Sequence, residues 1–286
     1  MQKTTRSCLT NALRIAALCL LPALPAANGQ DLGPAVAIVE QAVRDGGVLG
    51  GAVLVVQNDK PLLEQSFGIC DLNDRRPFEN DTICWIASLT KPVTAAAALV
   101  LVDDGKLDLD ATVESYLPEF RDQTTVDGQA SPVTVRQLLS HSSGIQASVP
   151  TRPSQFFDPI WLERSLKEIP PEIAKTKLEF QPGARSQYSN AAPYVMGRIV
   201  EIQSGQTFGQ FVRSRILQPL GMQDTGFSIA REKLPRAAVV YRRERDTLVE
   251  FCRYDPEWRV AMTMPDGGLF PTPADIAKFA TVFLKD

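Results

Sequence analysis

Histidine is almost absent from this sequence, which holds a single one, His141, among 286 residues. One histidine cannot supply the paired ligands of an HExxH zinc site or a zinc finger, so we expect no metal site of these kinds. An excess of either charge is also missing, because 30 Lys and Arg oppose 33 Asp and Glu, for a formal net charge of −3. Nucleic-acid binders carry basic patches, so we expect no nucleic-acid partner.

The N-terminal region lacks an apolar run long enough to cross a membrane. Its apolar run covers residues 15–24, whereas a spanning helix needs about 20 apolar residues. Basic residues precede the run and the small residues Ala27 and Gly29 follow it, as in a secretory signal peptide. We therefore predict a signal peptide over 1–29 and a domain over 30–286 that is periplasmic or secreted, with no stable membrane anchor after cleavage.

Cysteine is scarce, and two of the five cysteines, Cys8 and Cys19, fall inside the predicted signal peptide. The other three are Cys70, Cys84 and Cys252. An odd number means that at least one thiol has no partner within the chain. A Cys70–Cys84 disulfide and three unpaired buried thiols are both compatible with this spacing.

The periodicity of the remaining chain is that of a mixed α and β protein. Apolar residues at helical spacing predict a helix over 31–44, and two β-branched or apolar runs around a polar turn predict a hairpin with strands over 51–57 and 62–67. A segment that starts at Thr94 and ends before Gly105 is apolar on nearly every face, which predicts a fully buried helix.

Helices dominate the middle of the chain. We expect them over 134–140, 161–168, 191–203 and 208–217. Two strands are predicted to follow, at 237–242 and 248–253. Thr272 followed by Pro273 predicts the start of a last helix, since threonine caps helices and proline favours their first position.

Ser88-Leu89-Thr90-Lys91 is the only SxxK in the chain. Residues three apart share one helix face, so Lys91 can reach the Ser88 hydroxyl, accept its proton and generate a nucleophile. The alternative is a serine that caps a helix and a lysine that faces solvent. The motif directly precedes the most apolar helix, where an unused lysine is costly, and this favours a catalytic pair.

Tyr188-Ser189-Asn190 is the only YxN in the chain. A phenol beside a lysine can share proton transfer, and a carboxamide can both donate to and accept from a substrate amide. The competing interpretation is a loop tyrosine followed by Asn190 as the cap of a helix that begins near Ala191.

These motifs occur together with other segments that resemble one known family over about residues 50–283. The segments are 82–92 (TICWIASLTKP), 107–110 (LDLD), 116–118 (YLP), 138–144 (LLSHSSG), 180–183 (FQPG), 188–190 (YSN), 219–222 (PLGM) and 267–270 (GGLF). In this combination the chain resembles the serine β-lactamase and penicillin-binding protein superfamily, in the branch of class C β-lactamases, DD-peptidases and family VIII esterases.

The resemblance implies an α+β fold of the β-lactamase/transpeptidase type, in which an antiparallel sheet flanked by helices joins an all-helical domain. On this fold, residues 30–87 hold the first helix and the hairpin, 88–235 form the mainly helical part, and 236–286 begin the return to the sheet. The closing strands of the sheet are missing, so the resemblance leads us to expect a domain truncated at its C-terminus.

The resemblance also implies a serine hydrolase that forms an acyl-enzyme on Ser88. Lys91 and Tyr188 would manage the proton of Ser88, Asn190 would bind the amide side chain of the substrate, and the Ser88 N–H would be one oxyanion donor. The substrate would be a β-lactam, a D-amino-acid peptide or an ester, that is, a small-molecule or peptidoglycan-like partner, and no metal or organic cofactor is implied. His141 would be a buried, hydrogen-bonded structural residue.

One motif of the family has no counterpart in this sequence. Members carry Lys-Thr-Gly or His-x-Gly on a strand after the glycine pair 267–268, and the nearest match here is Lys175-Thr176-Lys177, without the glycine. That strand supplies a second oxyanion donor, and loss of one donor costs about 10²–10³ in rate. The alternative to a hydrolase is therefore a non-catalytic, penicillin-recognising remnant or binding protein.

Overall fold

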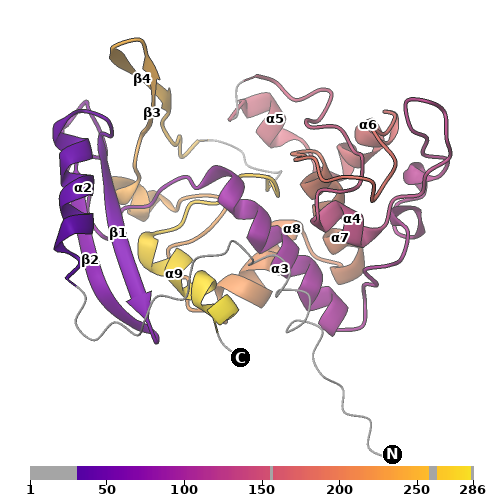
Figure 1. Ribbon diagram of the computed structural model, residues 1–286, viewed down its shortest axis with the longest axis horizontal. Coiled ribbons are helices and arrows are strands. Elements are labelled where there is room, and N and C mark those ends of the chain that lie inside the picture. The colour runs from indigo at the N-terminus through magenta and orange to yellow at the C-terminus, as the bar shows by residue number, and fades with distance from the viewer. Residues whose placement is uncertain (1–30, 155–156, 258–262, 285–286) are drawn as a thin grey trace, which may run out of the picture.

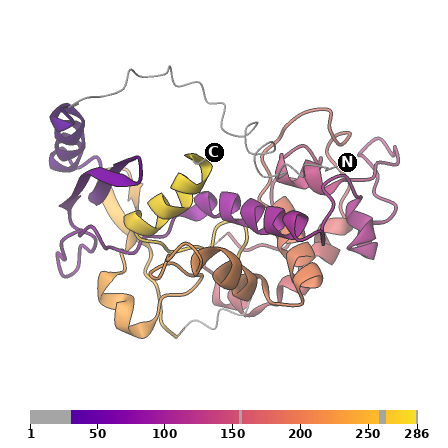
Figure 2. The same cartoon turned by 90° about the horizontal axis from the view of Figure 1, so that it is seen from below.

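The computed structural model describes residues 31–154, 157–257 and 263–284. The predicted signal peptide over 1–29 lies outside these residues. Helix α3 (Thr90–Asp103) runs through the middle of the molecule, with a β-hairpin on one side and a mainly helical part on the other (Figures 1 and 2). The predicted α+β class is confirmed. Within the described residues, no helix is long and apolar enough to cross a membrane.

The first hairpin pairs β1 (Gly50–Gln57) with β2 (Lys60–Gly68) in antiparallel orientation. Asn58 and Asp59 form the turn with φ of 50° and 61°. This left-handed conformation suits the right-handed twist of a hairpin, and Asn and Asp tolerate it better than most residues. The predicted hairpin is therefore confirmed, and its second strand begins two residues earlier than expected.

Two helices cover the hairpin without enclosing it. Helix α2 (Gly33–Arg44), where a helix was predicted, packs on β2, and α9 (Pro273–Thr281) packs on β1. Phe67 is the one buried residue of the two described strands. The hairpin is thus a half-covered platform, and the hydrophobic core lies mainly between α3 and the helical part.

Helix α3 begins four residues before Thr94 and therefore carries Lys91 in its first turn. Helices α7 (Ala192–Ser204) and α8 (Phe208–Val212) pack against it. The buried residues of α3 are Thr90, Val93, Thr94, Ala97, Ala98 and Leu101. The expectation of burial on every face is wrong, because α7 and α8 cover one side and the other side, mostly alanine and valine, stays half-exposed.

The helical part contains shorter helices than predicted. Helix α4 (Val135–Leu139) lies inside the expected range. The single helix predicted over 161–168 is wrong: α5 (Pro159–Glu163) ends early and a 3-10 turn follows at Leu166–Glu168. Ser165 accepts from the backbone of this turn while Glu168 accepts from the Ser165 N–H. Such local side-chain bonds compete with a continuous helix.

The other predicted helices of this part are present. Helix α7 confirms the helix expected over 191–203, and the range 208–217 holds α8 followed by a π-helical turn, Arg213–Leu217. Helix α6 spans Pro170–Ala174. Further 3-10 turns are Ala87–Leu89, Val113–Ser115, Pro118–Phe120, Arg231–Arg236 and Val282–Leu284.

A second hairpin pairs β3 (Val240–Glu244) with β4 (Thr247–Cys252). It projects from the body of the molecule on the side away from α9 (Figure 1). Strand β3 begins three residues later than predicted, because the preceding backbone pairs elsewhere. Ala238 N donates to Ile83 O at 2.9 Å, beside an isolated parallel bridge between Ile83 and Ala237.

The last helix, α9, has the predicted start. Thr272 Oγ1 accepts a hydrogen bond from Asp275 N at 3.3 Å, and Pro273 occupies the first helical position. The buried Asp275 carboxylate also accepts from Asp224 N at 2.8 Å and from Thr225 Oγ1 at 3.0 Å. These bonds tie α9 to the loop before the second hairpin.

The three described cysteines, Cys70, Cys84 and Cys252, are free thiols. Of the two alternatives compatible with the sequence, the structure thus has unpaired thiols rather than a Cys70–Cys84 disulfide. Burial raises the pKa of Cys84 and of Cys252 to about 12 and also raises that of Cys70. All three thiols are therefore protonated at neutral pH and poorly nucleophilic.

Candidate active site

Ser88 lies on a tight turn directly before α3. It is the middle residue of the 3-10 turn Ala87–Leu89 and is exposed to solvent. Ala87 has a φ of +45°, in the left-handed region that alanine rarely adopts. Such an outlier costs about 1–3 kcal/mol and persists only where surrounding contacts impose it, which occurs often at functional sites.

A distant segment of the chain holds this turn in place. Cys84 N donates to Pro271 O at 2.9 Å, and Ile86 N donates to Leu269 O at 3.2 Å. Residues 84–86 therefore lie beside 269–271, so a segment near the C-terminal end of the described chain fixes the backbone that leads into Ser88.

Lys91 contacts Ser88 and a main-chain carbonyl at the same time. Its Nζ donates a hydrogen bond to Ser88 Oγ at 3.0 Å and another to Asp266 O at 2.7 Å. An amine that donates to a fixed acceptor has its lone pair directed elsewhere. When Lys91 is an amine, its N–H bond to the Asp266 carbonyl leaves the lone pair free to face Ser88 Oγ, so that the contact reverses and the Ser88 hydroxyl can give its proton to Lys91.

Tyr188 lies beside the same lysine. Lys91 Nζ is 4.9 Å from the centroid of the Tyr188 ring, which places the ammonium within cation–π range. Tyr188 is half-exposed, so its hydroxyl can meet a bound molecule. The structure thus brings together Ser88, Lys91 and Tyr188, three residues that the sequence motifs single out.

Asn190 is available to a ligand because another residue caps α7. Ser189 Oγ accepts hydrogen bonds from Ala191 N and Ala192 N, both at 3.1 Å, and donates to Gln146 O at 2.7 Å. The alternative interpretation of Asn190 as the helix cap is therefore wrong. The Asn190 carboxamide makes no hydrogen bond to any residue that the structure describes, and Asn190 is only partly buried.

His141 positions the loop that carries Tyr188. Its Nδ1 accepts a hydrogen bond from Ser189 N at 3.2 Å, and its ring stacks on Tyr188 with centroids 4.8 Å apart. Burial, and second the charge of Lys91, lower the pKa of His141 below its usual value. The imidazole is therefore neutral at pH 7 with its proton on Nε2, and its contacts are those of a structural residue, although it is half-buried rather than fully buried.

Residues 265–269 clamp the first turns of α3. Thr94 Oγ1 donates to Pro265 O at 2.7 Å, and Leu269 N donates to Thr90 Oγ1 at 3.1 Å. Sequence reasoning did not single out Asp266, which lies inside this clamp. Its position one residue before the glycine pair was the available signal, but the contact to Lys91 uses a main-chain atom that any residue carries.

The Ser88 N–H lies at the turn, where the resemblance leads us to expect an oxyanion donor. The Ser88 N–H makes no backbone hydrogen bond within the described residues, so it can bind a developing negative charge next to Ser88 Oγ. Neither Lys-Thr-Gly nor His-x-Gly occurs among the described residues. They also contain no group of three or more His, Cys, Asp or Glu that could hold a metal ion.

Comparison with known proteins assigns the chain to a family. The family model described as Beta-lactamase matches residues 35–286, which is most of the chain. The chain belongs to the beta-lactamase family. This confirms the resemblance carried by the motifs, and the β-lactamase/transpeptidase type of fold is confirmed as well by solved structures of the family.

Relatives of this beta-lactamase family chain include an esterase, an amidase and a penicillin-binding protein homologue. Esterase EstB from Burkholderia gladioli is 35% identical over 212 residues, covering 72% of this chain and 53% of its own length. The penicillin-binding protein homologue from Pyrococcus abyssi (27% identity, TM-score 0.72) matches 88% of this chain and 56% of its own. The D-amino acid amidase from Ochrobactrum anthropi is 27% identical with a TM-score of 0.70, and the match covers 87% of this chain and 69% of the amidase chain. The chain spans just over half of the EstB length.

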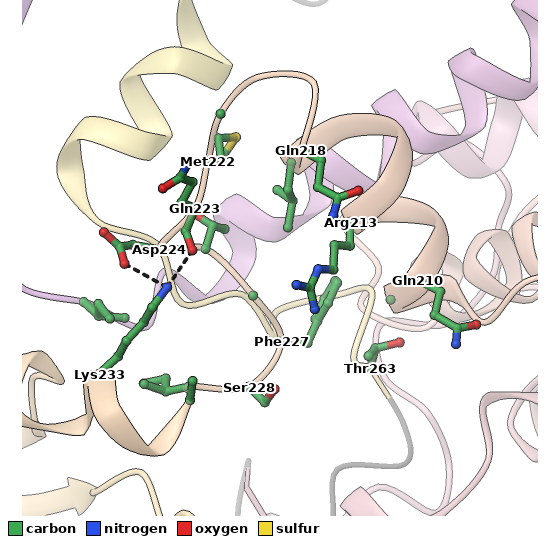
Figure 3. Close-up of a pocket in the computed structure, with 18 of the residues that line it drawn as sticks. Gln210, Arg213, Gln218, Met222, Gln223, Asp224, Phe227, Ser228, Lys233 and Thr263 are labelled. Atoms are coloured by element: carbon green, nitrogen blue, oxygen red, sulfur yellow. Dashed lines mark hydrogen bonds and ion pairs between the residues drawn. The ribbon is translucent and has the colours of Figure 1, made fainter.

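One cavity of this family member lies apart from Ser88. It has a volume of about 780 Å³ between α8, the π-helical turn and the loop over 221–230 (Figure 3). Arg213 points toward Phe227 across it, while Lys233 binds Asp224 at 2.9 Å. Its lining includes none of the residues placed around Lys91, so this cavity is separate from the site described above.

Proposed function

We propose that this chain is a serine hydrolase of the beta-lactamase family that acts through an acyl-enzyme on Ser88. One observation carries the proposal: Lys91 Nζ lies 3.0 Å from Ser88 Oγ while the Asp266 carbonyl holds it at 2.7 Å. A nucleophile with a base in hydrogen-bond reach, and a third group that orients the base, is the arrangement that activated nucleophiles require.

The residues divide the acyl transfer between them. Lys91 takes the proton of Ser88 as Oγ attacks the carbonyl carbon of the substrate, and the Ser88 N–H binds the resulting oxyanion. Tyr188, in contact with Lys91, passes a proton to the leaving group, whose bond to the carbonyl carbon breaks. Water then attacks the ester formed on Ser88 and releases the acid. Asn190 binds an amide group of the substrate.

The proposed substrates are small acyl donors, which include esters, β-lactams and the D-amino-acid peptides of peptidoglycan-like material. The names of the relatives, an esterase and a D-amino acid amidase, support this range. Exposure of Ser88 and of Leu89 beside it supports an open site that admits such molecules.

Binding without turnover is the second candidate. It is favoured by one observation, that the turn offers a single oxyanion donor, the Ser88 N–H, and none of the described residues supplies the third motif of the family. A protein of this kind acylates slowly and keeps the acyl group, since both steps need stabilisation of the same oxyanion.

Turnover assays separate the two candidates. We expect slow hydrolysis of p-nitrophenyl butyrate or a chromogenic cephalosporin by the wild-type chain and none by Ser88→Ala. Ser214→Ala, an exposed serine on the π-helical turn, is the matched control. Labelling of Ser88 by a fluorescent penicillin without any product release supports the binding candidate. Equal activity of the wild type and Ser88→Ala contradicts both.

We also propose export of the chain through the predicted signal peptide over 1–29. The pattern of basic, apolar and small residues in the sequence supports it. Expression in a bacterial host, followed by fractionation and intact mass measurement, tests it. A periplasmic product that begins at residue 30 is expected, and an unprocessed cytoplasmic product contradicts it.

A further inference from the structure

An ion pair lies buried next to the site. Arg152 Nη1 donates to Asp266 Oδ2, and the side chains of the two residues are 10% and 1% exposed. Burial of two charges is expensive unless they pair closely, and loss of one partner leaves an uncompensated buried charge. Arg152 therefore fixes the position of the Asp266 side chain more tightly than an exposed pair would.

The backbone of the same aspartate holds Lys91. Asp266 O accepts the 2.7 Å hydrogen bond from Lys91 Nζ, whereas Asp266 Oδ2 binds Arg152. A single residue thus connects the two cations. A change at the carboxylate that moves the Asp266 backbone therefore also moves the carbonyl that binds Lys91.

Other contacts restrict the ways in which this aspartate can respond. The guanidinium of Arg152 lies 5.9 Å from the ring of Tyr194, which is fully buried. Burial, and second the charge of the Asp266 carboxylate, raise the pKa of Tyr194. The neighbours Pro265 and Gly267 each accept a hydrogen bond from side chains around the nucleophile turn. Hydrogen bonds therefore hold the backbone on both sides of Asp266, and Arg152 is the cation that binds its carboxylate.

We propose that Arg152 is a positioning residue for Lys91, acting through Asp266, whose carboxylate binds Arg152 and whose main-chain carbonyl binds Lys91. This inference rests on the proposed function, in which Lys91 is the base for Ser88. Arg152 keeps the Asp266 carbonyl in place, so that the lone pair of Lys91 points to the Ser88 hydroxyl. It also neutralises a buried carboxylate that would otherwise attract the charge of Lys91.

Removal of the Arg152 charge and removal of the Asp266 charge should have opposite effects on the protonation of Lys91. Among the described residues, the polar side chains that contact Lys91 include Ser88 and Tyr188, and His141 stacks on Tyr188. Arg152→Met leaves a negative charge near Lys91, which favours the ammonium form, so the base becomes active only at higher pH. Asp266→Asn leaves a positive charge, which favours the amine form and moves the pH midpoint down.

The test is the rate at which a fluorophosphonate probe labels Ser88 as a function of pH. We expect Arg152→Met to slow labelling by about 10- to 100-fold, the cost of a misplaced catalytic group, and to raise the pH midpoint. Arg152→Lys should recover part of the rate, and Asp266→Asn should lower the midpoint. Arg215→Met is the matched control, since it breaks an ion pair with Asp104 at the far end of α3.

Each outcome decides the inference. A wild-type rate and midpoint in Arg152→Met, or midpoints that move in the same direction in Arg152→Met and Asp266→Asn, overturn it and leave the proposed function standing. No labelling of Ser88 in the wild type overturns the proposed function and the inference with it. If Arg152→Met does not fold, two results still test the inference. They are the direction in which the pH midpoint of Ser88 labelling moves in Asp266→Asn, and the partial labelling rate of Arg152→Lys.

Discussion

Gly197 lies in α7 directly behind the segment that holds Lys91, and adding a methyl group there should disturb the site more than the fold. A Cβ at this position would lie 2.6 Å from Pro265 Cγ and 3.2 Å from Leu166 Cδ2. Ordinary contact begins at 3.4 Å, so Pro265 has to move by roughly 0.8 Å. Pro265 precedes Asp266, and therefore the carbonyl that orients Lys91 moves with it.

The free energy of unfolding should change little in Gly197→Ala. Overpacking of a dense core costs about 1–3 kcal/mol, and alanine regains about 1 kcal/mol over glycine inside a helix. A net loss of about 1 kcal/mol remains. The rate effect is larger, because misplacement of a catalytic group by about 1 Å can cost about 10²-fold.

The assay compares thermal unfolding with the rate of Ser88 labelling by a fluorophosphonate. Gly197→Ala should retain cooperative unfolding and label Ser88 at least about tenfold more slowly. The control is Gly209→Ala in α8, whose Cβ would lie 2.7 Å from the end of the Thr263 side chain, which can turn away. Labelling of Gly197→Ala at the wild-type rate would refute the argument that this segment sets the position of Lys91.

Three further predictions concern stability and reactivity. Hydrogen bonds from Arg236 hold the pKa of Asp224 at about 2. The contribution of ionised Asp224 to the free energy of unfolding is therefore complete above about pH 4 and is lost as the pH falls towards 2. Asp224→Asn should cost about 1 kcal/mol at pH 7 after solvent screening and flatten the acid limb of a urea-unfolding series; an unchanged limb contradicts this. Ser189→Ala removes the acceptor for two N–H groups of α7 and should cost about 1–2 kcal/mol in the same assay, whereas no loss would mean that the cap is dispensable. Iodoacetamide should modify Cys84 and Cys252 only after denaturation, because their pKa values of about 12 keep them protonated; rapid modification of the folded chain, followed by mass spectrometry, contradicts it.

Short-range patterns predicted much of the fold correctly. The hairpin over 50–68 follows from an Asn-Asp turn between two apolar runs, and α9 follows from a threonine cap before a proline. The contact between Ser88 and Lys91 follows from their spacing, because three residues bring two side chains to the same face of a helical turn.

Failures arose where several local solutions compete. Ser189 and Asn190 are both able to cap α7, and only the fold selects Ser189. The helix expected over 161–168 breaks because Ser165 and Glu168 satisfy backbone groups that a continuous helix would use. Helix periodicity does not report such competition between side chain and backbone.

The part of the site that sequence could not predict is its support. Lys91 and Asp266 are 175 residues apart, and their contact uses a main-chain carbonyl that carries no residue-specific signal. Arg152 lies in a loop without periodicity, 114 residues from its partner. Both become visible only when the fold brings residues 265–269 against the first turns of α3.

The most direct test of the central claim is the location of the covalent adduct. The wild-type chain is incubated with a fluorophosphonate, digested and mapped by tandem mass spectrometry, with Ser88→Ala treated in parallel. The account predicts one adduct, on Ser88, that disappears in Ser88→Ala and forms more slowly in Lys91→Met. An adduct on any other residue, or labelling that persists undiminished in Ser88→Ala, contradicts it.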